Sequence, residues 1–426
     1  MSGTPRLSRR AASIKPPATF AVAAKAKALR QRGIDVLGMS LGEPDFDTPE
    51  PARRAAIDAI NAGQTHYVPT MGDGETRAVV AEKFTRENRL PDVTGDHVSI
   101  SVGAKHSLFL VAQALLDDEG GQGTGPSADV ANEVLLPVPS WVSYAPIAML
   151  AGGRVVELPT TPEADFKITP AQLRGAITAR SRMLLLNTPS NPCGTMYTPS
   201  ELRALAAVIA EAAGSVAPDL VIVVDEIYEK IVFGGIEHLS IGSLPGVAGR
   251  TITINGLSKA YAMTGWRVGF AAASGEFGRS LAKAIDGLQG QMTSCLPAFI
   301  YPAIRAALKE CGAASETMRA EFARRATLIH GLAKAIPGLR TRTPTGAFYL
   351  FPDVSAFFGK RTLGGKTLRT SLDFADALLE EARLAVVPGE EFGGCGANHI
   401  RLSYACSQDQ IREGMGRLAA FTASLK

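Results

Sequence analysis

The sequence predicts an α/β protein with a largely parallel sheet, joined to a smaller α+β part. Three observations predict this class. Before about residue 312, short apolar runs alternate with stretches of helical pattern. These runs are apolar throughout, which is typical of strands that a parallel sheet buries on both faces. From about residue 312 the pattern changes to one long amphipathic stretch followed by mixed strands and helices.

The elements can be assigned in chain order. In the first part we expect strands over residues 97–101, 134–136, 183–186, 220–224 and 251–254. Helices are expected over residues 105–116, 141–151 and 200–213. The last of these begins where a proline and a serine favour a helix start. The second part should hold helices over 316–335, 373–382 and 408–424, and strands over 347–351, 384–387 and 399–404.

Two segments are expected to be loops, at 117–129 and 358–371. The first is rich in glycine and serine, but it lacks the strand and helix that flank a phosphate-binding loop, so we interpret it as a surface insertion. The first 34 residues are basic and carry no acidic side chain. That composition fits a transit peptide or an arm that embraces a partner, and we favour the arm.

Composition excludes several function classes. The 426 residues suit two or three domains, and 46% hydrophobic with 20% charged residues is ordinary for a globular protein. A net charge of +3 gives no reason to expect nucleic acid or a membrane as partner. No apolar run is long enough to span a bilayer. The five cysteines are scattered and no Cys/His cluster has metal spacing, so we expect a cytoplasmic protein without a metal.

The segment 256–269 carries the strongest chemical pattern. A strand delivers Lys259 into a turn of small residues, and Arg267 follows eight positions later. A partly buried lysine has a lowered pKa and can act as an imine-forming amine. An arginine beside it can hold a phosphate with two hydrogen bonds. The alternative is a solvated lysine and arginine on an ordinary strand–helix connection.

This segment resembles the lysine motif of the class I and II pyridoxal-phosphate aminotransferases. Other segments resemble that family in the same order: 40–49 its N-terminal turn, 187–194 its Asn-Pro loop, 224–228 its strand-end acid and tyrosine, and 399–404 its carboxylate-binding strand. The resemblance runs from about Lys15 to the C-terminus and is closest to the bacterial aspartate and prephenate aminotransferase subgroup.

The resemblance implies the fold type I architecture, in which a large domain with a mostly parallel seven-stranded sheet binds pyridoxal 5'-phosphate. It implies an N-terminal arm over 1–17, a small α+β domain from 18–48 and 313–426, and a large domain over 49–312. It also implies a homodimer with shared active sites.

The resemblance further implies how the cofactor ring is held. Lys259 carries the cofactor, and Asp225 at the end of a strand faces the pyridine nitrogen, where a carboxylate keeps the ring protonated. Tyr228 and Asn191 reach the phenolic oxygen. Trp141 stacks on the ring, where an aromatic face attracts a cationic ring. From the residues alone, Asp225 could instead cap a helix, and the two aromatic residues could belong to the core.

The phosphate is assigned to a turn and to side chains around it. Gly103, Ala104 and Lys105 follow a strand and open a helix, where free backbone N–H groups attract phosphate. Ser258 and Arg267 add a hydroxyl and a guanidinium. The family often has a serine where this chain has glycine, three residues before the lysine. The family also supplies a tyrosine from the neighbouring subunit, and Tyr67 matches it.

The substrate side of the site follows from the same resemblance. Arg401 in an apolar strand needs an anion, and the resemblance supplies the substrate α-carboxylate, with Gly42, Asn191 and Trp141 nearby. Some members of the family bind the distal carboxylate of the substrate with an arginine from the partner subunit, in a segment that matches residues 287–295. In this chain those residues contain no arginine. The subgroup uses a lysine and a threonine that match Lys105 and Thr19, and Lys15 is a further candidate. These residues favour aspartate or glutamate, although Lys105 could instead face solvent.

The predicted function is amino-group transfer between an L-amino acid and a 2-oxo acid, in two half-reactions. Alternatives of the same fold are prephenate aminotransferase, lyase, cyclase or γ-substitution chemistry, because fold does not fix function. A silent binding protein on this scaffold is disfavoured, since Lys259, Asp225, Arg267 and Arg401 are all present.

Overall fold

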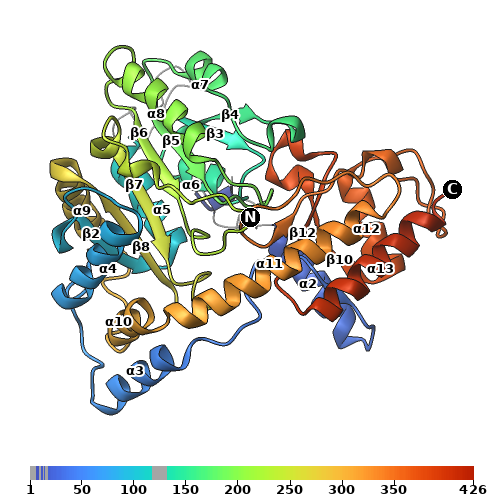
Figure 1. The fold of residues 1–426 in the computed structure, drawn as a ribbon, viewed down its shortest axis with the longest axis horizontal. Coiled ribbons are helices and arrows are strands. Elements are labelled where there is room, and N and C mark those ends of the chain that lie inside the picture. Colours follow the sequence, from blue (N-terminus) through green and yellow to red (C-terminus); the bar gives the residue numbers. More distant parts are fainter. Residues whose placement is uncertain (1–5, 9–10, 13, 15–17, 118–131) are drawn as a thin grey trace, which may run out of the picture.

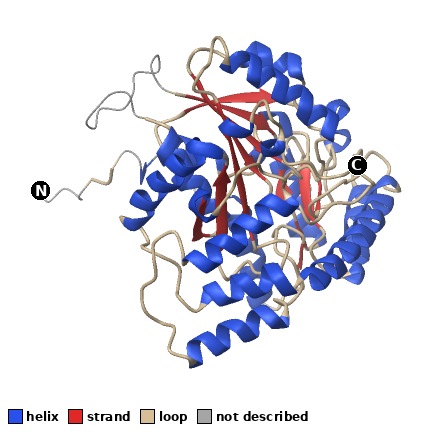
Figure 2. Cartoon of the chain, turned by 60° about the vertical axis from the view of Figure 1, so that its left-hand side comes forward, coloured by secondary structure: helices blue, strands red, loops and turns tan. Residues whose placement is uncertain are grey.

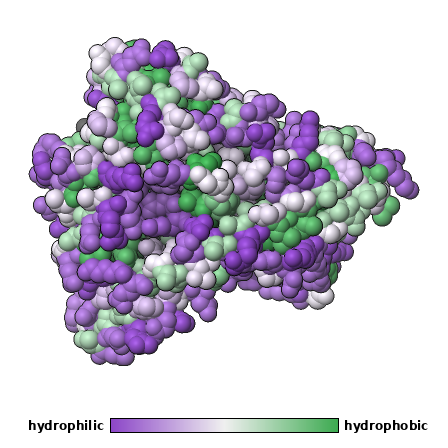
Figure 3. All heavy atoms as spheres, in the orientation of Figure 1, coloured by the Kyte–Doolittle hydropathy of each residue, from purple (hydrophilic) through white to green (hydrophobic). Residues whose placement is uncertain are grey.

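A computed structural model describes residues 6–8, 11–12, 14, 18–117 and 132–426. Lys15 and most of the insertion over 117–129 lie outside these residues. Figure 1 shows a sheet-bearing part and a smaller C-terminal part, with the long helix α11 (Gly312–Lys334) running between them. Hydrophilic residues cover most of the face in Figure 3. Within the described ranges, no helix combines the length and apolar content that crossing a bilayer requires.

Seven strands form the main sheet, in the order β2-β8-β7-β6-β5-β3-β4. Neighbours pair in parallel except at β8, which is antiparallel to both β2 and β7. The bounds are β2 Val98–Val102, β3 Glu133–Val138, β4 Arg154–Pro159, β5 Ser181–Asn187, β6 Val221–Asp225, β7 Thr251–Gly256 and β8 Val268–Ala273. The predicted α/β class with a mostly parallel seven-stranded sheet is confirmed.

Both faces of this sheet are buried, as its apolar strands predicted. Along β6, Val221 and Val223 pack into one core cluster, while Ile222 and Val224 pack into another. Figure 2 shows helices on both sides of the red strands. The helices of this part are α3 (Glu50–Asn61), which packs on α10, and α4 (Gly74–Glu87), α5 (Ala104–Leu115), α6 (Tyr144–Leu150), α7 (Pro170–Ala176), α8 (Pro199–Ala213), α9 (Gly275–Gly290) and α10 (Ile300–Glu310).

The start of α8 shows how local sequence fixes an element. Thr198 caps the helix, and its hydroxyl accepts a hydrogen bond from the backbone N–H of Glu201 at 3.3 Å. The Glu201 carboxylate in turn accepts from the Thr198 N–H at 2.7 Å, which completes a capping box. Pro199 occupies the first helical position, where its missing N–H costs nothing.

The C-terminal part is built on two small sheets. β1 (Leu37–Gly38) pairs with β10 (Leu384–Ala385), and β12 (Ile400–Ser403) lies between β11 (Val387–Pro388) and β9 (Tyr349–Leu350). Around them lie α2 (Ala18–Gln31), α12 (Ser371–Ala382) and α13 (Gln408–Ser424). Short 3-10 helices lie at Gly95–His97, Pro162–Ala164, Ile241–Ser243, Ala248–Arg250, Ser355–Phe357, Gly389–Phe392 and Gly394–Gly396.

The prediction of a single strand over 384–387 is wrong. Leu384 and Ala385 pair in parallel with β1, whereas Val387 and Pro388 pair antiparallel with β12. The chain changes partner at Val386, which is buried. An apolar run of four residues indicates that both halves are buried, but it does not indicate which strand each half pairs with.

Candidate active site

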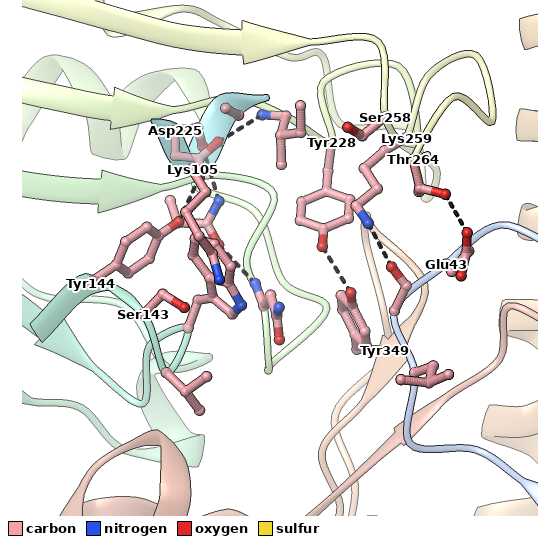
Figure 4. Close-up of a pocket in the computed structure, with 18 of the residues that line it drawn as sticks. Glu43, Lys105, Ser143, Tyr144, Asp225, Tyr228, Ser258, Lys259, Thr264 and Tyr349 are labelled. Atoms are coloured by element: carbon pink, nitrogen blue, oxygen red, sulfur yellow. Dashed lines mark hydrogen bonds between the residues drawn. The ribbon is translucent and has the colours of Figure 1, made fainter. Parts of the chain in front are cut away.

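A cavity of about 510 Å³ opens where the carboxyl ends of β5 and β6 face the C-terminal part of the chain. Figure 4 shows side chains converging on it from several elements. Eleven of the residues singled out in the sequence line it together: Gly42, Ala104, Lys105, Trp141, Asn191, Asp225, Tyr228, Ser258, Lys259, Arg267 and Arg401. Ligands of α/β proteins bind at this edge of the sheet.

Lys259 follows β7 and points its amine into this cavity. Its Nζ donates a hydrogen bond to the carbonyl oxygen of Gly42 at 2.5 Å and lies 5.9 Å from the centre of the Phe348 ring. Burial, together with the positive charges of Arg267 and Arg401, lowers the pKa of Lys259 to about 8. The amine therefore reaches its nucleophilic neutral form far more readily than a solvated lysine does.

Asp225 ends β6 and is 3% exposed. One carboxylate oxygen accepts a hydrogen bond from the Tyr144 hydroxyl at 2.8 Å, and the other accepts from the N–H of Ile227 at 3.1 Å. Burial nevertheless raises the pKa of Asp225 to about 6. A cation placed against this carboxyl group would stabilise its ionised form, so the group suits a ligand with a protonated nitrogen.

Arg401 in β12 is 2% exposed. Its guanidinium donates to Asn191 Oδ1 at 2.8 Å and to the carbonyl oxygen of Ser40 at 2.5 Å, and it lies 4.7 Å from the centre of the Tyr349 ring. Its Nε is buried and has no hydrogen-bond partner. A buried guanidinium with an unsatisfied donor is suited to bind an anion such as a carboxylate.

A second anion-binding feature forms where β2 runs into α5. Gly103 has φ +86°, and a Cβ atom there would lie 2.1 Å from a guanidinium nitrogen of Arg267. Gly103 precedes α5 and has no side chain to cap the N–H groups of the first turn. Arg267 itself has φ +56°, and Ser258 is 7% exposed beside it in the cavity lining. A helix N-terminus with a guanidinium beside it is suited to phosphate.

Lys105 and Trp141 form one wall of the cavity. The Lys105 ammonium lies 4.8 Å from the centre of the Trp141 ring, and that ring meets Tyr144 edge-on at 5.3 Å. Burial and the charge of Arg267 lower the pKa of Lys105. The sequence did not single out Tyr144, although it lies three residues after Trp141 and reaches Asp225.

Tyr228 and Tyr349 meet across the cavity, and their hydroxyls are 2.8 Å apart (Figure 4). Both are buried, and burial raises the pKa of each. Tyr349 comes from β9, more than a hundred residues away. Its strand was predicted, but no local pattern distinguishes this tyrosine from a core residue. Asn187, Ser143, Glu43 and Thr264 also line the cavity and were not singled out.

A buried polar cluster fixes the turn that carries Tyr228. Lys83 and Asn88 come from α4 and its C-terminal end, and Glu226 and Glu229 from the turn after β6; all four are at most 8% exposed. Asn88 Nδ2 donates to both carboxylates, at 2.8 and 2.6 Å, and Lys83 pairs with Glu229. Burial and the adjacent Glu229 raise the pKa of Glu226. The Lys83 ammonium supplies the positive charge here, so we assign this cluster a structural role.

Four predicted residues are not among the described residues that line the cavity. Tyr67 is 90% exposed at the surface. Thr19 belongs to α2, where its side chain is not described, and Lys15 lies outside the described residues. Gly103 is not part of the lining but touches it through Arg267.

A buried lysine amine, a buried carboxyl group and two arginines line one cavity of this α/β protein, and such a set is suited to covalent chemistry on an anionic ligand. The sequence pattern of the family described as aminotransferase class I and II matches residues 34–418. The aspartate aminotransferase of Geobacillus stearothermophilus is 40% identical over 98% of both chains. The aspartate/prephenate aminotransferase of Cereibacter sphaeroides is 39% identical over 98% of this chain and 99% of that one.

Solved structures agree with this relationship. The aspartate aminotransferase of Rhizobium meliloti superposes with a TM-score of 0.90 at 37% identity, over 99% of this chain and all of that one. The Thermus thermophilus enzyme, solved with maleate, gives 0.86 at 38% identity, over 98% of this chain and 100% of that one. The chain belongs to the class I and II aminotransferase family, and it is an aminotransferase.

Proposed function

We propose that this aminotransferase uses pyridoxal 5'-phosphate to move an amino group between aspartate or glutamate and a 2-oxo acid. The observation that carries the proposal is the pairing of Lys259 and Asp225 in one cavity that also holds Arg401. An amine, a carboxyl group and a guanidinium are the three groups that amino-group transfer on this cofactor requires.

The residues present fit the cofactor. Asp225 is a buried carboxyl group whose pKa rises to about 6 unless a cation faces it, and the protonated ring nitrogen would be that cation. Gly103 leaves room that any side chain would fill, beside the guanidinium of Arg267. The cofactor, when bound, supplies a conjugated ring that takes up the electron pair left when the substrate loses its α-proton.

Each residue then has a proposed role. Lys259 would hold the cofactor through its aldehyde, with loss of water; Tyr228 and Asn191 would face the ring oxygen, and Trp141 would pack on the ring. The phosphate is held by Arg267, Ser258, the backbone of Gly103 and Ala104, and Lys105 nearby, with Tyr67 contributed by a second subunit. These roles are supported by the shared cavity, and for Tyr67 by its exposure of 90%.

The chain's own groups carry out binding and proton transfer. Arg401, Asn191 and the backbone at Gly42 hold the α-carboxylate of the amino acid. Lys259, whose amine would be set free when the amino group of the substrate takes its place on the cofactor, would remove the α-proton as a general base and deliver it to a neighbouring carbon as a general acid. Tyr349, which lies on the guanidinium of Arg401, keeps that group in place.

The preference for an acidic substrate is proposed from Lys105. Its ammonium lies against the Trp141 ring on the cavity wall and is a candidate partner for a distal carboxylate, with Thr19 and Lys15 as candidates beside it. Relatives named as aspartate aminotransferases, and one solved with the dicarboxylate maleate, support this choice.

Prephenate is a second candidate acceptor, because relatives from several bacteria and a plant are named for both aspartate and prephenate. Lyase, cyclase and γ-substitution chemistry have no comparable support.

A substrate panel tests the proposal. The cofactor-loaded enzyme is mixed with aspartate, glutamate, aromatic amino acids and arginine, and with prephenate as acceptor, and new 2-oxo acid is measured. We expect aspartate or glutamate to react best. Lys105→Met should lower kcat/KM for aspartate about ten- to a hundredfold and leave aromatic amino acids nearly unchanged, because an unpaired substrate carboxylate costs on the order of 1–3 kcal/mol. An equal loss for both substrates would contradict the role of Lys105.

We also propose the remaining features that the sequence implied. The protein is a homodimer that acts in the cytoplasm on small molecules. Its small domain comprises 18–48 and 313–426, and its large domain 49–312. The division is supported by a core cluster that joins Leu37 and Met39 to residues of α11, α12 and α13.

A further inference from the structure

A strap of residues 40–48, between β1 and α3, lies beside Lys259, whose amine donates to the carbonyl oxygen of Gly42 in the strap. It lies against the lysine loop, residues 257–267 between β7 and β8. Two hydrogen bonds join their far ends: the Thr48 hydroxyl donates to the carbonyl oxygen of Ala262 at 3.1 Å, and the Trp266 indole donates to the Thr48 hydroxyl at 2.9 Å. The strap and the loop therefore behave as one unit at that end.

Near the lysine, a side-chain pair makes the corresponding contact. The Thr264 hydroxyl donates a hydrogen bond to the Glu43 carboxylate, as Figure 4 shows. The carbonyl oxygen of Thr264 accepts from Arg267 at 2.8 Å. Ala262 and Arg267 on either side both have positive φ, of 51° and 56°. A backbone held in this region needs ties to its surroundings, and the Glu43 contact is one of them.

The charges around Lys259 give Glu43 a second effect. Two cations, Arg267 and Arg401, oppose protonation of the lysine, while Glu43 and Asp225 favour it. Asp225 is already engaged by Tyr144 and the turn after β6, and in the proposed function it serves the cofactor ring. Glu43 has the largest effect of these four charges. It is thus the anion available to balance the two guanidinium groups.

We propose that Glu43 is a positioning residue for Lys259: its hydrogen bond with Thr264 ties the strap to the lysine loop, and its carboxylate is the anion of the strap that balances the two guanidinium groups beside that amine. The strap carries the carbonyl groups of Gly42 and Ser40, which bind Lys259 and Arg401 respectively. One carboxylate therefore aligns contacts to both the amine and the carboxylate-binding guanidinium. The inference concerns the proposed function and rests on Lys259 being its reactive amine.

The test measures the protonation of Lys259 itself. Full-length chain freed of cofactor is labelled with a trace of acetic anhydride at a series of pH values, and acylation of Lys259 is quantified by peptide mass spectrometry. Glu43→Gln keeps an oxygen that can accept from Thr264 but removes the charge. It should lower the pH midpoint of labelling by about half a unit, a small effect because Glu43 is exposed and solvent screens its charge. Glu50→Gln, an equal change of charge on α3, should leave the midpoint unchanged.

A second experiment tests the hydrogen bond between Thr264 and Glu43. In Thr264→Val the backbone amides of residues 40–48 should exchange with deuterium about two- to tenfold faster, as expected on loss of one hydrogen bond, and Thr264→Ser should restore the wild-type rate. The proposal is overturned if the Glu43→Gln midpoint coincides with the wild-type one, or if exchange in the strap is unchanged in Thr264→Val. Failure of the proposed function would show separately, as wild-type chain that takes up no cofactor.

Discussion

Lys259 and Asp225 lie in one cavity. The pKa of Lys259 is lowered to about 8 and that of Asp225 is raised to about 6, so both shifts favour the neutral form of the group. Burial causes both shifts, because a charged group loses hydration inside the protein. Two such groups suit a ligand that brings charge of its own. A protonated ring nitrogen would stabilise the carboxylate of Asp225, and an aldehyde would consume the neutral amine of Lys259.

The cost of burying Asp225 leads to a prediction about stability. The pKa of its carboxyl group in the folded chain, about 6, exceeds the ordinary 3.8, so ionisation destabilises the fold, in full above pH 6 and less as the pH falls toward 4. In cofactor-free chain, Asp225→Asn should raise the free energy of unfolding at pH 7.5 by up to about 3 kcal/mol, and by about half that at pH 5. Urea unfolding at both pH values measures this.

The same variant separates stability from catalysis. Loaded with cofactor, Asp225→Asn should lose at least about a hundredfold in kcat, because the ring is no longer kept protonated. Asp409→Asn, at an exposed side chain near the start of α13, is the control and should change neither quantity. Equal stability of Asp225→Asn and wild type at both pH values would show that burying the ionised carboxyl group does not destabilise the fold.

At the scale of elements, the close approach of β8 to the start of α5 builds the proposed phosphate site. A Cβ at Gly269 would lie 2.2 Å from the backbone carbon of Gly103 and 2.3 Å from the nitrogen of Ala104. These are backbone atoms of two elements, so neither can turn aside as a side chain could. Glycine at this position lets β8 lie against the turn that Arg267 faces.

Gly269→Ala should therefore disturb cofactor binding. We expect a loss of about 1–3 kcal/mol in stability from overpacking and at least a tenfold weaker affinity for pyridoxal phosphate. Thermal unfolding and an absorbance titration measure the two effects. Gly331→Ala in α11 is the matched control, because nothing lies within 4 Å of the added atom, and it should be neutral or slightly stabilising. Unchanged cofactor affinity in Gly269→Ala would remove this strand from the phosphate site.

The elements also show what the sequence could predict. Strands such as β6 were found because they are apolar on both faces, and α8 because a proline and a serine stand at its start; its cap, Thr198, was not identified. β4 was missed because it is an edge strand with a largely exposed, charged pattern, and β8 because small residues hide its burial. The split at Val386 depends on partners far along the chain.

In the site, too, residues in local motifs could be predicted and residues that depend on distant contacts could not. Lys259, Asp225 and Arg401 stand in local motifs, so the resemblance assigned them. Tyr349 and Glu43 act through residues more than a hundred positions away, Tyr228 and Thr264, and no local pattern records such a contact.

At the scale of the whole molecule, Tyr67 is the residue that bears on assembly into a dimer. It is a large aromatic residue left 90% exposed, and the proposed function places it at the phosphate of a second subunit. A hybrid dimer tests this. One subunit carries Lys259→Ala and an intact Tyr67; the other carries Tyr67→Phe and an intact Lys259. The single competent site of the hybrid then receives a wild-type Tyr67.

We expect this hybrid site to bind pyridoxal phosphate with wild-type affinity. The Tyr67→Phe homodimer should bind about ten- to a hundredfold more weakly, as expected for loss of a hydrogen bond to a charged group. Differently tagged subunits allow the hybrid to be isolated, and absorbance titration gives both affinities. If hybrid and Tyr67→Phe homodimer bind equally, the tyrosine does not act across an interface.

The central claim is that the amine of Lys259 bonds to the aldehyde of pyridoxal phosphate. The most direct measurement is to load the chain with the cofactor, reduce it with borohydride, digest it and locate the added mass by mass spectrometry. The claim predicts one phosphopyridoxyl group per chain, on the peptide that contains Lys259, and none at that position in Lys259→Ala. An adduct on another lysine, with Lys259 unmodified, would contradict it.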